Sequence, residues 1–209
     1  MATPTSTVSE RIIDAALDLA LDRGWRGVAL ADIAARAQVP LAELVEHFPT
    51  RTHILDGYAR RIDRRMMDGA IDASESPRDR LFEVVMRRFD AMAPHRAALA
   101  VVLRDGGADP WALLCGARRF ARSMALTLET AGITSAGLTG LARVEGLALA
   151  YLYVLRVFLD DDSADLARTM AALDKALGRA EGMAAMLWRR GQPRHQAEAQ
   201  PAAGAPVAP

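Results

Sequence analysis

Polar residues between positions 36 and 51 have the types and spacing expected of a DNA-binding surface. Glu43 and His47 stand four residues apart and therefore share one side of a helix. In a DNA-binding helix that side faces base edges and phosphates. Glu43 could accept a hydrogen bond from the amino group of cytosine, and Arg36, His47 and Arg51 could hold phosphates.

Two short helices must position these side chains. Over residues 30–37 the apolar side chains fall at i, i+1 and i+4, at Ile33, Ala34 and Ala37, and predict one buried stripe. Val39 fills the turn that follows. Over residues 41–48 an apolar repeat at i, i+3, i+4 and i+7 predicts the core side of a second helix, made of Leu41, Leu44, Val45 and Phe48. The pattern is that of a helix-turn-helix, with Leu41, Ala42 and Glu43 placed to meet base edges.

Charge argues against a strong general attraction to nucleic acid. The chain has 26 basic and 26 acidic residues, and residues 10–61 contain eight acidic against seven basic side chains. Each phosphate neutralised by a protein adds about one to the salt dependence of binding, so this module has few such contacts to offer. We expect local and weak DNA binding, which a homodimer would strengthen by doubling the contacts.

The rest of the sequence predicts an all-α protein of about nine helices. Apolar residues repeat with helical spacing between glycine and proline breaks. The predicted helices cover residues 9–23, 30–37, 41–48, 51–73, 78–93, 95–104, 110–131, 137–159 and 164–189. We divide the chain into a disordered start at 1–8, a helix-turn-helix domain at 9–65, a ligand-binding and dimerisation domain at 66–190 and a disordered tail at 191–209.

Two sets of apolar residues in the second domain are candidates for binding. One could line a pocket for an apolar small molecule; it comprises Phe89, Met92, Leu103, Trp111, Leu114, Phe120, Met124 and Tyr151. The other lies on the last two long helices and predicts a dimer interface; it comprises Leu147, Leu155, Phe158, Met170, Leu173 and Leu177.

No pattern for catalysis, a cofactor or a metal is present. The sequence has no glycine-rich phosphate loop, and its four histidines have no ligand spacing. Three aspartates precede Ser163; we interpret this corner as a helix cap, although a metal is the alternative. A single cysteine, Cys115, and the absence of a secretion signal predict a cytoplasmic protein without disulfides.

The first third of the chain resembles the TetR/AcrR family of bacterial regulators. The resemblance rests on Arg11, Ile12, Ile13, Ala15, Ala16, Leu17, Leu21, Gly24, Asp32, Ile33, Ala34, Ala37, Val39, Leu44, Phe48, Pro49, Thr50, Arg51, Ile54 and Leu55. It implies a TetR-like homodimer that binds duplex DNA and responds to an apolar ligand. Family members typically begin the recognition helix with Ser or Thr, place Tyr after its Leu and open the next helix with Lys or Arg. This chain has Pro40, Val45 and Arg51 there.

The C-terminal half also resembles a lipid-binding accessory family of ubiquinone biosynthesis that is built on a TetR-type fold. That resemblance rests on Leu159, Asp160, Ser163, Asp165, Thr169, Leu173, Asp174 and Leu177, with Arg87, Arg88, Phe89 and Pro94. It implies an isoprenoid lipid ligand, loss of DNA binding and membrane contact by the C-terminal helix. Three hypotheses therefore remain. The transcriptional regulator comes first and the lipid-binding accessory protein is the alternative. The neutral charge and the acidic residues of the second helix also leave open a protein-interaction module with neither activity.

Overall fold

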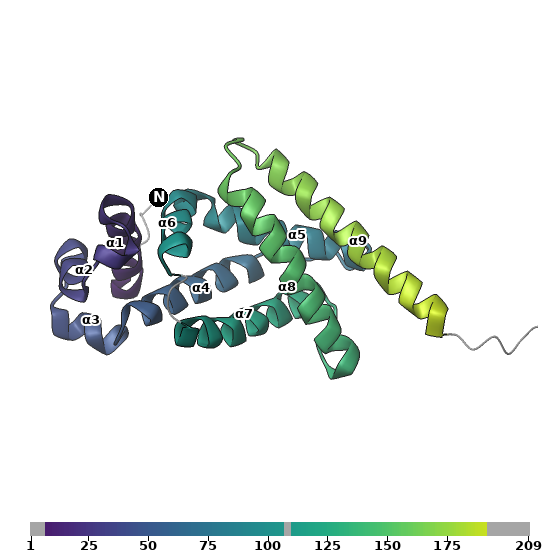
Figure 1. Ribbon diagram of the computed structural model, residues 1–209, viewed down its shortest axis with the longest axis horizontal. Helices are drawn as coiled ribbons and strands as arrows, with labels where there is room; N and C mark the ends of the chain where they lie inside the picture. The colour runs from purple at the N-terminus through teal and green to yellow at the C-terminus, as the bar shows by residue number, and fades with distance from the viewer. Residues whose placement is uncertain (1–6, 107–109, 192–209) are drawn as a thin grey trace, which may run out of the picture.

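The computed structural model describes residues 7–106 and 110–191, and the regular secondary structure of these residues consists of helices alone. A small group of helices lies at one end of the molecule, and a larger bundle makes up the rest (Figure 1). The all-α, TetR-like architecture predicted from the sequence is confirmed. The predicted disordered tail at 191–209 and most of the predicted start at 1–8 lie outside the described residues.

The N-terminal group consists of α1 (Val8–Arg23), a 3-10 turn η1 (Trp25–Gly27), α2 (Leu30–Ala37) and α3 (Leu41–His47). Thr7 and Glu10 cap α1 reciprocally in a capping box. Gln38 ends α2 with φ of 56°, a left-handed conformation that closes the helix. The three predicted helices of this domain are therefore present at nearly their predicted bounds.

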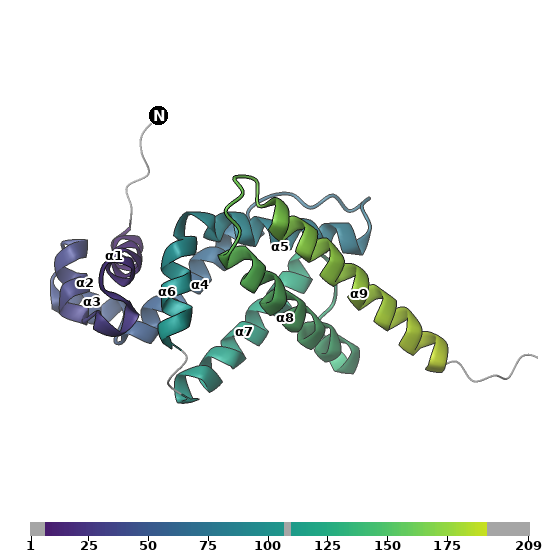
Figure 2. The same ribbon diagram turned by 45° about the horizontal axis from the view of Figure 1, so that its top comes forward.

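Helix α4 (Arg51–Met67) runs from this group into the larger bundle and belongs to both (Figures 1 and 2). Thr50 caps its start by accepting from the His53 amide. It ends six residues before the predicted residue 73, because the chain turns at Gly69, where φ is 131°.

The larger bundle follows α4 and continues to the C-terminal helix (Figure 2). Its elements are α5 (Pro77–Met92), η2 (Ala93–His95), α6 (Arg96–Gly106), α7 (Pro110–Thr130), α8 (Gly137–Leu159) and α9 (Ala167–Gly191). Helices α8 and α9 lie side by side in both views, joined by the aspartate-containing corner. Helix α9 begins three residues later than predicted, because Leu166 adopts a left-handed φ of 54°.

Helix α8 is long and apolar enough to cross a membrane by length and composition alone. Part of it is core: Val144, Leu147, Tyr151, Val154 and Phe158 are buried among the other helices. Buried helices of water-soluble proteins have the same composition, so this property does not define a membrane segment.

Candidate nucleic-acid interface and its control elements

Helices α2 and α3 form the predicted helix-turn-helix. Ile33, Ala34 and Ala37 are buried, and Val39 fills the turn as predicted. Phe48 packs directly on the backbone of α4 at Gly57, where an added Cβ would lie 2.6 Å from the Phe48 ring. A side chain at position 57 would collide with Phe48, so the glycine allows the end of α3 to pack closely against α4.

The outer face of α3 is more apolar than its sequence pattern predicts. Leu44 is fully buried and Phe48 nearly so, but Leu41 and Val45 are 46% and 41% exposed. The prediction that all four residues form the core side is therefore wrong for two of them, because a seven-residue helix with little packed above it buries only a narrow stripe. Ala42 and His47 are exposed as predicted, and Glu43 is half-exposed.

Arg51, which was predicted to hold a phosphate, makes contacts within the N-terminal domain. Its Nη1 donates hydrogen bonds to the carbonyl oxygens of Trp25 at 2.7 Å and Val28 at 2.8 Å, and its guanidinium lies 5.7 Å from the Trp25 ring centre. These bonds close the loop between α1 and α2. Arg51 therefore has a structural role in this loop, and its phosphate contact stays a prediction, because a phosphate would compete with the carbonyls of Trp25 and Val28 for its donors.

Other cations near α3 are also engaged within the domain. Arg36 pairs with Asp22 at 2.8 Å, and this hydrogen bond raises the pKa of Arg36. Arg23 pairs with Asp32, and Arg26 donates to the Asp105 carbonyl at 3.1 Å. A phosphate contact by any of these side chains would have to compete with a partner already in place.

Asp105 connects the larger bundle to the N-terminal domain. Its carboxylate accepts a hydrogen bond of 2.8 Å from the backbone amide of Trp25. The Trp25 carbonyl also accepts a hydrogen bond from Arg51 of α4. The end of α6 and the start of α4 are therefore both bonded to η1. The sequence contained no signal for this contact, because it joins residues 80 positions apart.

A second junction lies deeper along α4. The buried Arg61 donates to Asp14 of α1 at 2.6 Å, and His95 of η2 meets the Tyr58 ring edge-on with ring centres 5.5 Å apart. Burial and the neighbouring Arg61 lower the pKa of His95. Burial also raises the pKa of Tyr58. His95 is therefore neutral at pH 7 and acts as a packing residue between the two domains.

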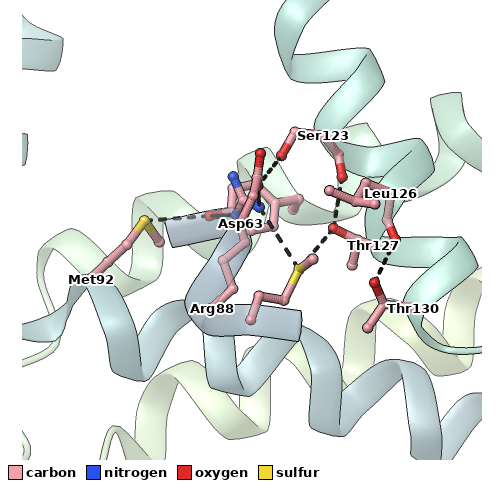
Figure 3. A network of polar contacts seen from close by, with 9 residues as sticks. Asp63, Arg88, Met92, Ser123, Leu126, Thr127 and Thr130 are labelled. Atoms are coloured by element: carbon pink, nitrogen blue, oxygen red, sulfur yellow. Dashed lines mark hydrogen bonds and ion pairs between the residues drawn. The ribbon is translucent and has the colours of Figure 1, made fainter. Parts of the chain in front are cut away.

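The larger bundle contains a buried polar network that the sequence patterns did not reveal (Figure 3). Arg88 of α5 is 5% exposed and donates to the Asp63 carboxylate on α4 and, at 3.1 Å, to the Tyr151 hydroxyl on α8. Ser123 of α7 donates to the same carboxylate at 2.6 Å. Burial alone would lower the pKa of Arg88, but Tyr151 and Asp63 outweigh it and raise that pKa. The ion pair and its two additional hydrogen bonds thus connect four helices, α4, α5, α7 and α8.

Five of the eight predicted pocket residues surround this network. Phe89, Met92, Met124 and Tyr151 are buried, and Phe120 is partly buried beside them. The Phe89 and Tyr151 rings stack with centres 5.0 Å apart, and Phe120 lies 5.6 Å from Tyr151. The prediction of Leu103 is wrong, because it is 50% exposed on the outside of α6. The side chains of Trp111 and Leu114 lie outside the described residues.

The residues predicted for the dimer interface lie inside the protomer instead. Leu147, Phe158, Leu173 and Leu177 are buried, and Leu155 and Met170 pack against the same core. These side chains join α8 to α9 and to the rest of the bundle, so the four buried ones are not available to a second subunit, whereas Leu155 and Met170 remain partly exposed. The opposite side of α8 is uncovered and carries five large apolar residues, Leu138, Leu141, Leu149, Leu152 and Tyr153, with the charged Glu145 and Arg156 on the same side.

The aspartate corner is a helix cap, as interpreted from the sequence, although Asp161 supplies most of it. The buried Asp161 accepts from the Thr169 hydroxyl at 2.7 Å and the Thr169 amide at 2.8 Å, and also from Ser163. Burial opposes ionisation of Asp161, but these hydrogen bonds outweigh it and hold its pKa well below the ordinary range. Among the described residues no group of three or more potential ligands could hold a metal ion.

Comparison with known proteins assigns this architecture to a class. Residues 12–57 match the family model of bacterial regulatory proteins of the tetR family. The N-terminal domain is therefore a TetR-type helix-turn-helix domain, in which α3 is the second helix of the motif.

Individual relatives agree with this class. The chain is 26% identical over 128 residues to the HTH-type transcriptional regulator AlkX of Mycobacterium tuberculosis, a match that spans 53% of this chain and 61% of that protein. The structure of a TetR transcriptional regulator from Nitrosomonas europaea superposes with a TM-score of 0.70 at 24% identity, covering 83% of this chain and 98% of the other. A TetR regulator from Rhodococcus sp. RHA1 gives 0.60 at 23% identity, covering 81% and 92%.

These structural matches extend over both domains, so the TetR-like fold includes the C-terminal bundle. The resemblance of that bundle to the ubiquinone accessory family is not confirmed by these comparisons, and the solved structures that match it carry the names of transcriptional regulators.

Proposed function

We propose that this protein is a homodimeric, cytoplasmic transcriptional regulator that binds duplex DNA through α3 and responds to a small apolar molecule. The observation that carries the proposal is a TetR-type helix-turn-helix whose α3 buries Leu44 against the core and leaves its outer face open. Such a helix is shaped to enter the major groove. The named relatives are regulators, and we expect no catalytic activity.

Within this proposal the base-contacting residues are Leu41, Ala42 and Glu43, with His47 beside a phosphate. Of the two arginines predicted to hold phosphates, Arg36 could do so by exchanging its exposed partner Asp22. Arg51 supports the recognition helix indirectly, through the η1 carbonyls. Few phosphate contacts predict a shallow dependence of affinity on salt.

The proposed dimer interface is the uncovered side of α8. Leu138 is 87% exposed and Leu149 is 71% exposed, on a helix whose other side is already packed. A row of large apolar side chains in water is stabilised by covering it, and a second copy of the same helix presents a matching apolar surface. Two such subunits would hold two recognition helices at a fixed spacing.

The proposed ligand site is the aromatic cluster around Tyr151. Phe89, Phe120 and Met124 supply apolar contacts, and the Tyr151 hydroxyl and Ser123 supply hydrogen-bonding groups. Pockets of this kind combine apolar walls with a few polar groups that orient the ligand. A ligand that parts α5, α7 and α8 would change the position of α4 and hence the spacing of the recognition helices.

The experiment that tests the proposed function is a fluorescence-anisotropy titration of the full-length protein against duplex DNA from its own upstream region. A scrambled duplex of equal composition is the control, and both are measured at low and moderate salt. We expect tighter binding to the native duplex and a shallow salt slope. Equal or absent binding to both duplexes would contradict regulation at this site.

A further inference from the structure

We propose that α3 recognises the methyl groups of thymine, with Leu41 and Val45 as the residues that contact them. The proposal rests on the DNA-binding function proposed above and specifies which feature of the bases the helix detects. It follows from three properties of the recognition surface: its exposed apolar side chains, its lack of hydrogen-bond donors for purines and the engagement of the cations around it.

The exposed apolar side chains lie together on one side of α3. Leu41 and Val45 are separated by one helical turn, and the exposed Ala42 lies beside them at i, i+3 from Val45. Both large side chains were expected in the core and are instead more than 40% exposed. Single exposed apolar residues are ordinary, but two large ones adjacent on the recognition helix form a continuous apolar contact surface.

The polar residues of α3 cannot supply the usual contacts to purines. Guanine is recognised in the major groove by Arg or Lys, and adenine by Asn or Gln. The helix sequence Leu41–His47 contains none of these four types. Its carboxylates, Glu43 and Glu46, can only accept, which suits the amino group of cytosine. Apolar contact is what Leu41 and Val45 can offer, and thymine is the standard base with a methyl group in the major groove.

We expect phosphate contacts to contribute little to the binding free energy, so that contacts with the bases contribute most of it. Arg51 is committed to the η1 carbonyls, and Arg36, Arg23 and Arg26 each have a partner within the protein. The helix itself carries two acidic residues and one histidine. Affinity therefore depends more on close contact with base edges than it would in a module with free arginines.

The test replaces thymine with deoxyuridine, which lacks only the methyl group. The full-length protein first selects its preferred duplexes from a random duplex library, and the enriched duplex is then synthesised with one thymine at a time exchanged. Loss of one buried methyl corresponds to about fourfold weaker binding, equivalent to ~0.8 kcal/mol. We expect this loss at one or two thymines of each half-site, and about 15-fold when the same thymine is exchanged in both half-sites of a dimer.

The variants Leu41→Ala and Val45→Ala determine which side chain detects the methyl. Each should bind the parent duplex more weakly and should lose its sensitivity to deoxyuridine at one position while keeping it at others. Leu21→Ala, an equally exposed leucine on α1, is the matched control and should keep the full sensitivity. Thermal unfolding checks that all three variants are folded, which their exposure leads us to expect.

The outcomes separate this proposal from the function on which it rests. If no duplex is enriched, DNA recognition itself fails and both proposals are overturned. If a duplex is enriched but every deoxyuridine exchange leaves the affinity unchanged, methyl recognition is overturned and the regulator proposal stands. The same holds if Leu41→Ala and Val45→Ala retain the sensitivity of the wild-type protein.

Discussion

Removing the Asp63 carboxylate should destabilise the protein strongly, because it would leave the buried Arg88 without its counter-charge. The Arg88 side chain is 6% exposed and that of Asp63 is 16% exposed. In Asp63→Ala the only remaining oxygen partner of the Arg88 side chain in this network is the Tyr151 hydroxyl at 3.1 Å. Breaking a buried ion pair from one side costs about 3–5 kcal/mol.

The second substitution tests the reason for that loss. Arg88→Met removes the charge. It also breaks the pair from one side, but Asp63 is the more exposed partner and keeps the hydrogen bond from Ser123, so the cost should lie near the lower end of that range, about 3 kcal/mol. The double variant Asp63→Ala, Arg88→Met should therefore be more stable than Asp63→Ala alone. Ser123→Ala, which removes one hydrogen bond to the same carboxylate, should cost about 1 kcal/mol and serves as the control.

Urea unfolding followed by circular dichroism measures these differences, with all variants at one protein concentration because the stability of the proposed dimer would depend on it. If Asp63→Ala costs less than about 1 kcal/mol, Arg88 is not desolvated as the structure indicates. If the two single effects simply add in the double variant, the buried charge is not the cause of the loss.

Three further predictions concern Arg51, α8 and Asp161. Arg51→Met should lower stability by about 2 kcal/mol through loss of charged hydrogen bonds to η1, and should leave the salt slope of DNA binding unchanged. A slope lower by about one in anisotropy titrations would instead restore Arg51 as a phosphate ligand. Leu149→Glu and Leu152→Glu should give monomers in analytical ultracentrifugation, whereas Leu103→Glu, as exposed as Leu152, should stay dimeric; three identical masses would refute the α8 interface. Because the folded pKa of Asp161 is depressed, its carboxylate stabilises the fold above about pH 4, and this contribution is lost as the pH falls further. The stability difference between wild type and Asp161→Asn should shrink between about pH 5 and 2 in urea melts, and a constant difference would contradict the assignment.

The helices were predictable from the sequence because their signals are local. Proline at the start of α5, the Thr50 cap of α4 and the left-handed residue after α2 each depend on a few neighbouring positions. Helix α4 was predicted too long because its basic residues continue a helical pattern up to Gly69, whose backbone breaks it. Local patterns thus give element type well and element ends less well.

The candidate sites were harder to predict because they depend on which side of a helix is covered. Helix α8 is apolar around most of its circumference, so its periodicity could not separate the core side at Leu147 from the open side at Leu149. Arg88 was named only in a family resemblance and was not predicted to be buried. No local pattern indicates that Asp63, 25 positions earlier in the sequence, pairs with it in the fold. Arginine commonly binds phosphate, and the sequence could not show that Arg51 donates hydrogen bonds to backbone carbonyls of the same domain.

Helix α4 connects the two domains, as the end of α6 also does. Its first residue, Arg51, holds the η1 turn, Arg61 holds α1, and Asp63 holds α5 and α7 through Arg88 and Ser123. A helix of 17 residues spans about 25 Å and moves as one rod. A ligand that displaces α5 must therefore either break the Arg88–Asp63 pair or move α4 with it. Because Phe48 rests on Gly57 without an intervening side chain, a moving α4 carries α3 along. Under the proposed function, the buried ion pair, and not the surface charge, would set how strongly ligand binding in the bundle is coupled to α3.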